Sequence, residues 1–210
     1  KPYHRRGHAF LGRALLANEE WEEAMEECQK ALEMDPGNIV ALTTLGLLEF
    51  RNDRRAGLHR LDEVLRIEPR NLDALLLRAE FRRAMNDFNG AIADARKASE
   101  IAGKLLSDPQ RSMGETYYAM NRLEEGKRMF EAALKINSRD TQAALGIPRY
   151  HVLKGRLKMA AVEYAGLCKS FPDDPDVLVA AANHHFGIAQ KLQTWQDQES
   201  GKEYNRAFDY

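Results

Sequence analysis

Small and apolar residues recur along the chain at helical spacing, and the pattern itself repeats. The segments "EEAMEEC" and "EEGKRMF" each place a small residue, Ala24 or Gly126, four positions before a larger apolar one, Cys28 or Phe130. Residues three or four apart share one face of a helix, so each segment predicts an amphipathic helix. No Val-, Ile- or Thr-rich alternating run argues for a strand. The pattern therefore predicts an all-α chain.

Two sets of small residues measure the period of the repeat. In the second helix of each predicted pair they fall, in steps of 33, 34, 35 and 34, at Ala24, Gly57, Ala91, Gly126 and Ala160. In the first helices the steps are 34, 33, 35 and 34, at Gly12, Gly46, Ala79, Gly114 and, in the fifth slot, Pro148. Both sets lose one residue in the turn at 51–53 and gain one between 101 and 109. A fixed period of this length is typical of stacked helical repeats.

At these positions the chain resembles the tetratricopeptide repeat family, whose 34-residue unit follows W-x2-L-G-x2-Y, then A-x3-F, then A and P. The first repeat matches through His8, Leu11, Gly12, Leu15, Ala24, Cys28, Ala31 and Pro36. The fourth matches through Met113, Gly114, Tyr117, Gly126, Phe130 and Ala133. The resemblance implies a right-handed α-solenoid of antiparallel helix pairs. It also implies that the first helices line a concave groove that holds a peptide or protein segment.

The period divides most of the chain into five repeats. They are predicted at about 5–38, 39–71, 72–106, 107–140 and 141–174. Residues 175–210 are predicted to form a divergent sixth helix pair or C-terminal capping segment, because the outer face of a terminal repeat meets water instead of a neighbour.

Three local features should modify this regular picture. Pro148 stands inside a predicted helix, so we expect a kink or a late helix start in the fifth repeat. Arg78 stands where the family usually has Leu, which predicts looser packing of the third repeat. Ser107 in "SDPQ" and the aspartates of "PDDPD" at 172–176 are expected to cap the first helices that follow them.

Helical spacing also predicts which side chains face the groove. The candidate binding residues are Arg6, Arg13, Leu47, Phe50, Arg51, Leu76, Arg83, Arg111, Tyr118, Arg149, Val152, Asn183 and Phe186. Arginine and aromatic side chains are favoured in interfaces, and arginine binds carboxylates with two hydrogen bonds. We therefore expect a non-catalytic scaffold or adaptor for an acidic, partly apolar segment. In the alternative, the leucines pack between first helices and the arginines pair with Glu80 and Glu115.

One specialised groove can be compared directly. Tetratricopeptide domains that hold the acidic tails of heat-shock chaperones use a clamp of Lys and Asn, then Asn, then Lys and Arg, on three successive first helices. The corresponding positions here hold Ala9 and Arg13, then Thr44, then Asp73 and Leu77. The residues do not fit, so a co-chaperone of that type is not expected.

Charge and tail composition bear on other partners. The net charge of −1 argues against a general nucleic-acid binder, because binding phosphates requires a basic surface. The basic segments "FRNDRR" and "EFRRAM" leave an RNA-binding helical repeat as a less favoured alternative. In a third alternative the chain assembles with itself, by docking the exposed end helix or the tail residues Trp195, Tyr204, Phe208 and Tyr210 into a neighbouring groove.

The residue pattern offers no chemistry. Nucleotide-binding and nucleophile motifs are absent, and the adjacent His184 and His185 point about 100° apart on a helix, so no cofactor, metal site or enzyme activity is expected. Cys28 and Cys168 are predicted to be buried and structural, which favours a reducing, cytoplasmic setting. No membrane insertion is expected, because no run of 18 apolar residues occurs. The first residue is Lys, which indicates a piece of a longer protein, so the compartment stays unassigned.

Overall fold

The computed structural model describes residues 2–188, with side chains from residue 7 onward. Ten helices follow one another as α1 (Pro2–Ala17), α2 (Trp21–Met34), α3 (Ile39–Asn52), α4 (Arg54–Ile67), α5 (Leu72–Ala84), α6 (Phe88–Ala102), α7 (Asp108–Ala119), α8 (Leu123–Ile136), α9 (Thr141–Leu153) and α10 (Leu157–Ser170). Residues 175–188 form a further helix, and no strand occurs between residues 2 and 188. The predicted all-α helical-repeat solenoid is confirmed.

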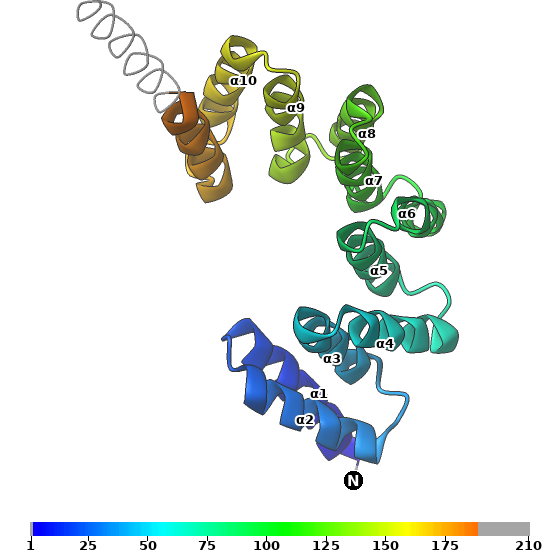
Figure 1. The fold of residues 1–210 in the computed structure, drawn as a ribbon. Coiled ribbons are helices and arrows are strands. Elements are labelled where there is room, and N and C mark those ends of the chain that lie inside the picture. Colours follow the sequence, from blue (N-terminus) through cyan, green and yellow to red (C-terminus); the bar gives the residue numbers. More distant parts are fainter. Residues whose placement is uncertain (1, 189–210) are drawn as a thin grey trace, which may run out of the picture.

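The helix pairs stack along a curved path, with α3 and α5 on its inner side and α4 and α6 on its outer side (Figure 1). Each helix packs against the next, and α1 also packs against α3, α5 against α7, and α7 against α9. By contrast, the backbones of α3 and α5 lie further apart than those of α1 and α3, so the backbones of the second and third pairs approach each other mainly at α4 and α5. The inner side of the stack is therefore more open between α3 and α5 than between α1 and α3.

Small residues lie where the two helices of a pair cross, as their spacing predicts. Ala24, Ala91 and Ala160 are fully buried. At Gly57 there is no room for a side chain, since an added Cβ would lie 2.6 Å from the Gly46 carbonyl oxygen and 2.6 Å from Phe50 Cβ. In the fourth pair the ring of Phe130, which is fully buried, lies directly against Gly114. Glycine and alanine thus set the distance between paired helices.

The lengths of two turns confirm the predicted loss and gain of one residue. Asp53 alone separates α3 from α4, whereas three residues separate the other paired helices. Its carboxylate accepts hydrogen bonds from the backbone N–H groups of Arg55 and Ala56, so one residue ends a helix and caps the next. The turn at 103–107 between α6 and α7 has five residues, where the other turns between pairs have four.

Asn and Asp side chains cap the first helices of most pairs. Asn38, Asn71 and Asp140 accept hydrogen bonds from backbone N–H groups at the starts of α3, α5 and α9. Asp174 caps the helix at 175–188 in the predicted way. The prediction for Ser107 is wrong, because its buried hydroxyl makes no capping bond and lies 2.6 Å from Asp140 Oδ2. The hydroxyl of Ser107 donates a hydrogen bond to the Asp140 carboxylate and accepts none from the backbone N–H groups of α7.

Pro148 does not delay the start of the fifth pair. The predicted late start of the helix is wrong, since α9 begins at Thr141 with Asp140 as its cap and continues through Pro148 to Leu153. Pro148 is fully buried. The cap at Asp140 fixes the first turn, and burial of the compact ring holds the proline inside the helix although it provides no N–H donor.

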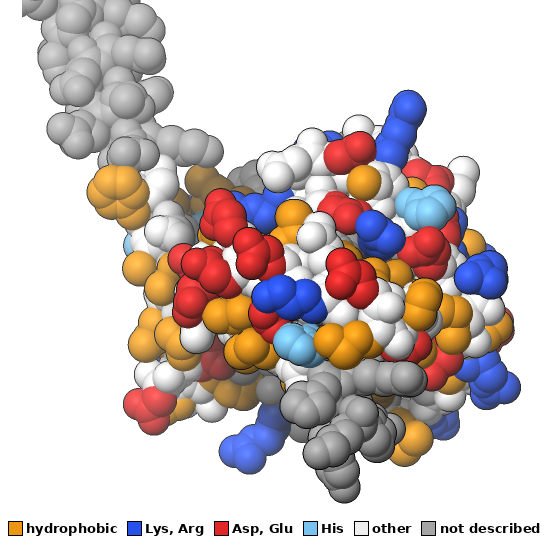
Figure 2. Space-filling model, turned by 90° about the horizontal axis from the view of Figure 1, so that it is seen from below, with side chains coloured by type: hydrophobic (Ala, Val, Ile, Leu, Met, Phe, Trp, Pro, Cys, Tyr) orange, Lys and Arg blue, Asp and Glu red, His pale blue; other side chains and the backbone are white. Residues whose placement is uncertain are grey.

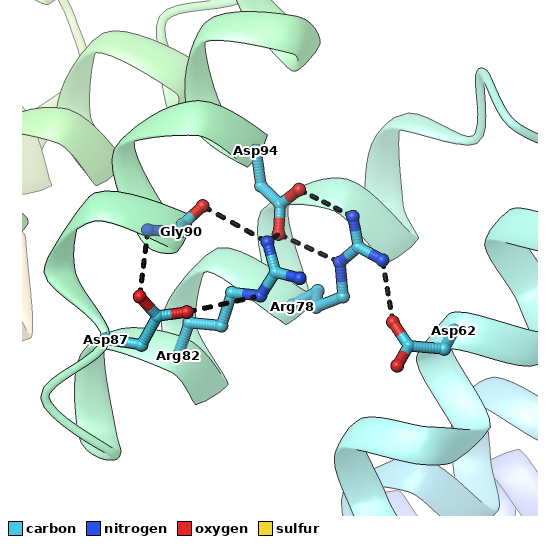
Figure 3. A network of polar contacts seen from close by, with 6 residues as sticks. All are labelled: Asp62, Arg78, Arg82, Asp87, Gly90 and Asp94. Atoms are coloured by element: carbon cyan, nitrogen blue, oxygen red, sulfur yellow. Dashed lines mark hydrogen bonds and ion pairs between the residues drawn. The ribbon is translucent and has the colours of Figure 1, made fainter.

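The third pair is held by an ion network instead of being loosely packed, so the expectation for Arg78 is wrong (Figure 3). Arg78 Nη2 lies 2.6 Å from Asp94 Oδ1 on α6, and Arg82 Nη1 lies 2.9 Å from Asp94 Oδ2. The side chain of Asp94 is only 5% exposed, so both of its oxygens depend on these arginines. Arg78 replaces the apolar contact of a leucine with hydrogen bonds.

The same network also joins the second pair to the third. Arg78 Nη1 lies 2.7 Å from Asp62 Oδ1 on α4 (Figure 3). A stacked contact between Phe50 on α3 and Phe81 on α5 adds to it, with ring centroids 3.6 Å apart. These side-chain contacts join the two pairs where the backbones of α3 and α5 lie apart.

The two cysteines differ in burial. Cys28 is buried where α2 crosses α1, as predicted, and burial raises the pKa of its thiol to about 11. Cys168 is only half-buried on α10, so its predicted burial is wrong. The difference arises because Cys28 lies against Gly12, which leaves no gap between the paired helices.

Substitution of Gly57 tests the close crossing of α3 and α4. We expect Gly57→Ala to lower the free energy of unfolding by about 1–3 kcal/mol, because the added methyl group overlaps Phe50 and the Gly46 carbonyl. Gly166→Ala on α10 is the matched control, since nothing lies within 4 Å of its added Cβ. That control should be neutral or raise the free energy of unfolding by about 0.5–1 kcal/mol. Urea denaturation followed by circular dichroism measures both, and equal effects would contradict the close crossing.

Substitution of Asp94 tests the ion network. We expect Asp94→Asn to lower the free energy of unfolding by about 2–3 kcal/mol, because it leaves two partly buried arginines without their carboxylate. Asp62→Asn provides the control, since Asp62 is half-exposed and its loss should be worth less than about 1 kcal/mol. A larger loss for Asp62→Asn in the same denaturation experiment would show that the buried carboxylate does not hold the pair together.

Candidate protein-binding groove

A hollow of about 710 Å³ opens on the inner side of the stack, between α1, α3 and α5. We call it the N-terminal groove. It is lined by Arg13, Leu16, Ala17, Ile39, Val40, Thr43, Thr44, Leu47, Asn71, Asp73, Leu76 and Leu77. Three residues predicted to bind a partner, Arg13, Leu47 and Leu76, therefore share one surface. It lies where α3 and α5 separate.

Most of the side chains that line the N-terminal groove are apolar. Leu47 lies at its centre on α3 and is 36% exposed, while Leu16 and Leu76 are half-buried on the neighbouring helices. A view onto the end of the molecule where α1 and α2 lie shows hydrophobic surface between charged side chains of both signs (Figure 2). Phe10 is 54% exposed beside Ile39 and Val40, which extends the apolar surface along α1.

Further along the inner side, a smaller hollow of about 220 Å³ lies between α5 and α7. It brings together Leu76, Arg83 and Arg111, all predicted to bind a partner, but both arginines are already paired with carboxylates of this chain. Arg83 lies 3.8 Å from Glu115. Arg111 pairs with Asp108, and its Nε lies 3.9 Å from Asp140.

Arg149 is also paired with a carboxylate of this chain. Its two Nη atoms lie 3.0 and 2.5 Å from the two Glu115 carboxylate oxygens, which is a bidentate pair. Its guanidinium group also lies over the ring of Tyr118, 5.4 Å from the centroid. Arg83 and Arg149 therefore both pair with Glu115, as in the alternative, and neither is a free cation. The Arg149–Glu115 pair joins residues 34 positions apart, which is one repeat period, so the sequence could offer it only as the alternative.

Two aromatic residues predicted to face the groove belong to the core. Tyr118 is 6% exposed, packs against Phe130, and donates its hydroxyl proton to the Gly146 carbonyl oxygen at 2.9 Å. Burial raises the pKa of its phenol. Phe50 is half-buried and stacked on Phe81. Both placements correct the prediction that these rings face a partner. Each ring instead fills a gap beside a neighbouring helix.

The other predicted residues lie outside the N-terminal groove. Arg51 is exposed at the end of α3, with its guanidinium group 3.8 Å from the ring centroid of Trp21 on α2. Val152 and Asn183 line a hollow of about 160 Å³ near the C-terminal end of the described stack. Phe186 is 64% exposed on the helix at 175–188. The side chain of Arg6 lies outside the described residues.

Sequence reasoning missed several side chains that line the N-terminal groove. Ile39 and Val40 belong to it but were absent from the predicted set. Leu16 also lines it, in agreement with the helical spacing that places it on the same face as Arg13, three positions away. Ile39 and Val40 open α3 beside the turn at 35–38, so only the stacking of α1 on α3 places them in the groove.

The histidine pair has a structural environment. His184 Nε2 lies 3.2 Å from the Leu157 carbonyl oxygen, and its ring packs on Tyr164 at a centroid distance of 5.0 Å. Within residues 2–188, no three His, Cys, Asp or Glu side chains are grouped in a way that could hold a metal ion. Over the same residues, no helix has the length and apolar character needed to cross a membrane.

The fold and groove define a class: an α-solenoid of helix pairs with a concave, largely apolar inner surface. Two tetratricopeptide repeat family models match, one at residues 5–38 and one at residues 111–175. The chain therefore carries tetratricopeptide repeats over these two stretches. This confirms the resemblance seen in the spacing of its small residues.

Comparison with individual proteins supports the fold. A thermophilic tetratricopeptide repeat protein of Thermus thermophilus superposes with a TM-score of 0.72 at 18% identity, covering 87% of this chain and 99% of that one. PilF of Pseudomonas aeruginosa gives a TM-score of 0.72 at 19% identity, covering 94% and 98%. Sperm-associated antigen 1 of Mus musculus is 26% identical over 53% of this chain, which spans 14% of that protein's length.

Substitution of Tyr118 tests its placement in the core. We expect Tyr118→Ala to lower the free energy of unfolding by about 3–5 kcal/mol, since it leaves a cavity beside Phe130. Tyr118→Phe should cost about 1 kcal/mol through loss of the hydrogen bond to Gly146. Leu47→Ala is the groove control and should cost less than about 1 kcal/mol, because Leu47 is exposed. Urea denaturation of the three variants checks this ranking of unfolding free energies. A loss for Tyr118→Ala as small as that for Leu47→Ala would contradict the placement of Tyr118 in the core.

Proposed function

We propose that the protein is a non-catalytic scaffold that holds a segment of a partner protein in the N-terminal groove. Tetratricopeptide repeats support protein–protein interaction in general terms. The observation that carries the more specific proposal is the apolar lining contributed by three helices, centred on Leu47 and open to solvent. A contiguous exposed apolar surface with a few charges at its edge is typical of a binding site.

The lining favours a partly apolar partner segment. Leu16, Leu47 and Leu76 would bury apolar side chains of the partner, which is the main favourable contribution to association. The proposed acidic character of the segment is supported by Arg13, which is exposed in the groove. Arg83, Arg111 and Arg149 add little to it, because carboxylates of this chain already neutralise them.

The two alternatives receive less support. Self-assembly through Trp195, Tyr204, Phe208 or Tyr210 involves residues outside the described part of the chain. RNA binding through the basic segments of the second and third pairs is disfavoured, because Arg82 is bound to Asp94 and Arg83 lies 3.8 Å from Glu115. Self-assembly would fill the groove with a segment of another copy, whereas RNA binding would leave its apolar lining unused.

Site-specific photocrosslinking in cell extract tests the proposal. We expect a photoreactive residue at Thr43, inside the N-terminal groove, to crosslink a partner protein, and the same residue at the exposed His59 on α4 not to. Adding Leu47→Arg to the Thr43 probe should reduce the crosslinked product at least about tenfold, because a central apolar anchor is replaced by a charge.

The control substitution is Val162→Arg on α10, where an exposed aliphatic residue outside the groove receives the same charge. It should leave the crosslink unchanged. Arg13→Glu should weaken capture if the segment is acidic. A product that survives Leu47→Arg would place the binding surface elsewhere and contradict the proposal.

A further inference from the structure

We propose that one edge of the stack docks on an anionic lipid surface, with two leucine side chains of the turn at 103–107 in the apolar layer of the lipid. This inference goes beyond the proposed function, because neither leucine lines the N-terminal groove. It is carried by the exposure of the leucines, the fixed conformation of their turn and the cations on either side. We call this surface the turn edge, and it comprises residues 66–71, 100–107 and 135–140.

The turn at 103–107 presents a protruding apolar tip. Leu105 is the most exposed large apolar side chain between residues 7 and 188, at 86%, and the neighbouring Leu106 is 39% exposed. Both lie in the turn between pairs that is one residue longer than the others. Single exposed leucines are common on protein surfaces. Two adjacent leucines in a lengthened turn instead expose apolar surface that the packing of the helices does not use, which indicates a contact surface.

The conformation of this turn is held at both ends. Gly103 has φ 61°, a conformation that favours glycine, and its N–H donates to the Ser99 carbonyl oxygen at 2.8 Å. The N–H of Leu105 donates to the Ala102 carbonyl oxygen at 3.2 Å. At the other end, the hydroxyl of Ser107 is buried and hydrogen-bonded. The turn is therefore ordered before it binds, and these two N–H groups already have the partners that an apolar surrounding requires.

Cations lie on both sides of the two leucines. Arg70 and Arg139 each stand one residue before a helix cap, in the turns before and after this one, and Leu106 holds the same place here. Because stacked pairs repeat one orientation, these turns follow one another along the same edge. Together with Lys104, both arginines are exposed, and none of the three forms an ion pair with another side chain of residues 7–188. The leucines are thus flanked by free positive charge.

The turn edge as a whole is positively charged. Glu68 and Glu100 are its exposed carboxylates, while Asp140 is half-buried, with one oxygen 3.9 Å from Arg111 Nε. Against them stand five exposed cations: Arg66, Arg70, Lys104, Lys135 and Arg139. The charge of the turn edge therefore complements an anionic partner.

An anionic lipid surface fits this arrangement better than a protein does. Leu105 projects from the edge, so it can enter a soft planar surface without a pocket prepared for it in the partner. Cations beside it can then reach lipid phosphate groups, and such contact requires no membrane-spanning helix. The turns at 35–38 and 171–174 contain carboxylates and no Lys or Arg, which limits the contact to the centre of the edge.

Vesicle flotation of the full chain tests the proposal, with vesicles of phosphatidylcholine alone or mixed with phosphatidylserine. We expect partitioning to be at least about tenfold higher on the mixed vesicles. Leu105→Ser should lower it at least about fivefold, because an apolar side chain no longer enters the lipid. Lys104→Gln with Arg139→Gln should lower it about 25-fold, since each cation near the surface contributes about fivefold.

Matched controls lie on α10, outside the turn edge. Val162→Ser removes an aliphatic side chain that is 72% exposed, and Arg156→Gln with Lys158→Gln removes two exposed cations. Both variants should partition like the unchanged chain. Losses equal to those of the turn-edge variants would show that net charge or general apolarity is responsible, and would overturn the assignment to the turn edge.

Fluorescence quenching by brominated lipid locates the contact. A tryptophan introduced as Leu105→Trp should be quenched on mixed vesicles, and one introduced as Val162→Trp should not. Equal partitioning on both kinds of vesicle, or on neither, would overturn the proposal. If vesicles are not bound but a photoreactive residue at position 105 captures a protein from cell extract, the turn edge is a protein-binding surface instead. The crosslink at Thr43 tests the groove separately, so either proposal can fail without the other.

Discussion

The close approach of two antiparallel helices at small residues is the constraint on which the rest of this structure depends. Gly46 against Gly57, and Gly114 against Phe130, leave no volume for an additional methyl group. Because each helix pair contacts only its neighbours, the spacing within a pair is transmitted along the stack. The curvature of the inner side, and hence the surface offered to a partner, is the sum of these local distances.

The second and third pairs show how a polar network can add to helix packing. Leu42, Val64 and Leu75 share one apolar core across the two pairs, although the backbones of α3 and α5 lie further apart than those of α1 and α3. Arg78 also reaches from α5 to Asp62 on α4 and to Asp94 on α6. Buried ion pairs gain little net stability over apolar packing, but they require specific partners and directions. Here the network holds the pairs in register while the space between α3 and α5 stays open as a groove.

Much of the fold could be predicted from the sequence, because helix pairing at a fixed period is a local property. The positions of Gly57 and Ala91, and the changes of turn length at 51–53 and 101–109, follow directly from that period. Positions that depend on a second helix pair could not be predicted. Helical spacing places Phe50 and Tyr118 on the inner face. It does not show that Phe50 stacks on Phe81, or that the Tyr118 hydroxyl donates to the Gly146 carbonyl oxygen, because both partners lie on later helices. The hydrogen bond from Ser107 to Asp140 likewise joins residues that lie 33 positions apart.

The single-residue connection at Asp53 has a consequence for how such a surface can change. With one residue in place of three, the start of α4 lies against the last turn of α3, and Gly57 meets the backbone of Phe50. The ring of Phe50 stacks on Phe81, and Leu47 is the exposed apolar residue of α3 that lines the groove. The length of a turn on the rim of the solenoid thus decides which side chains of a neighbouring helix a ligand can reach. A deletion there can alter recognition although every residue that faces the ligand keeps its identity.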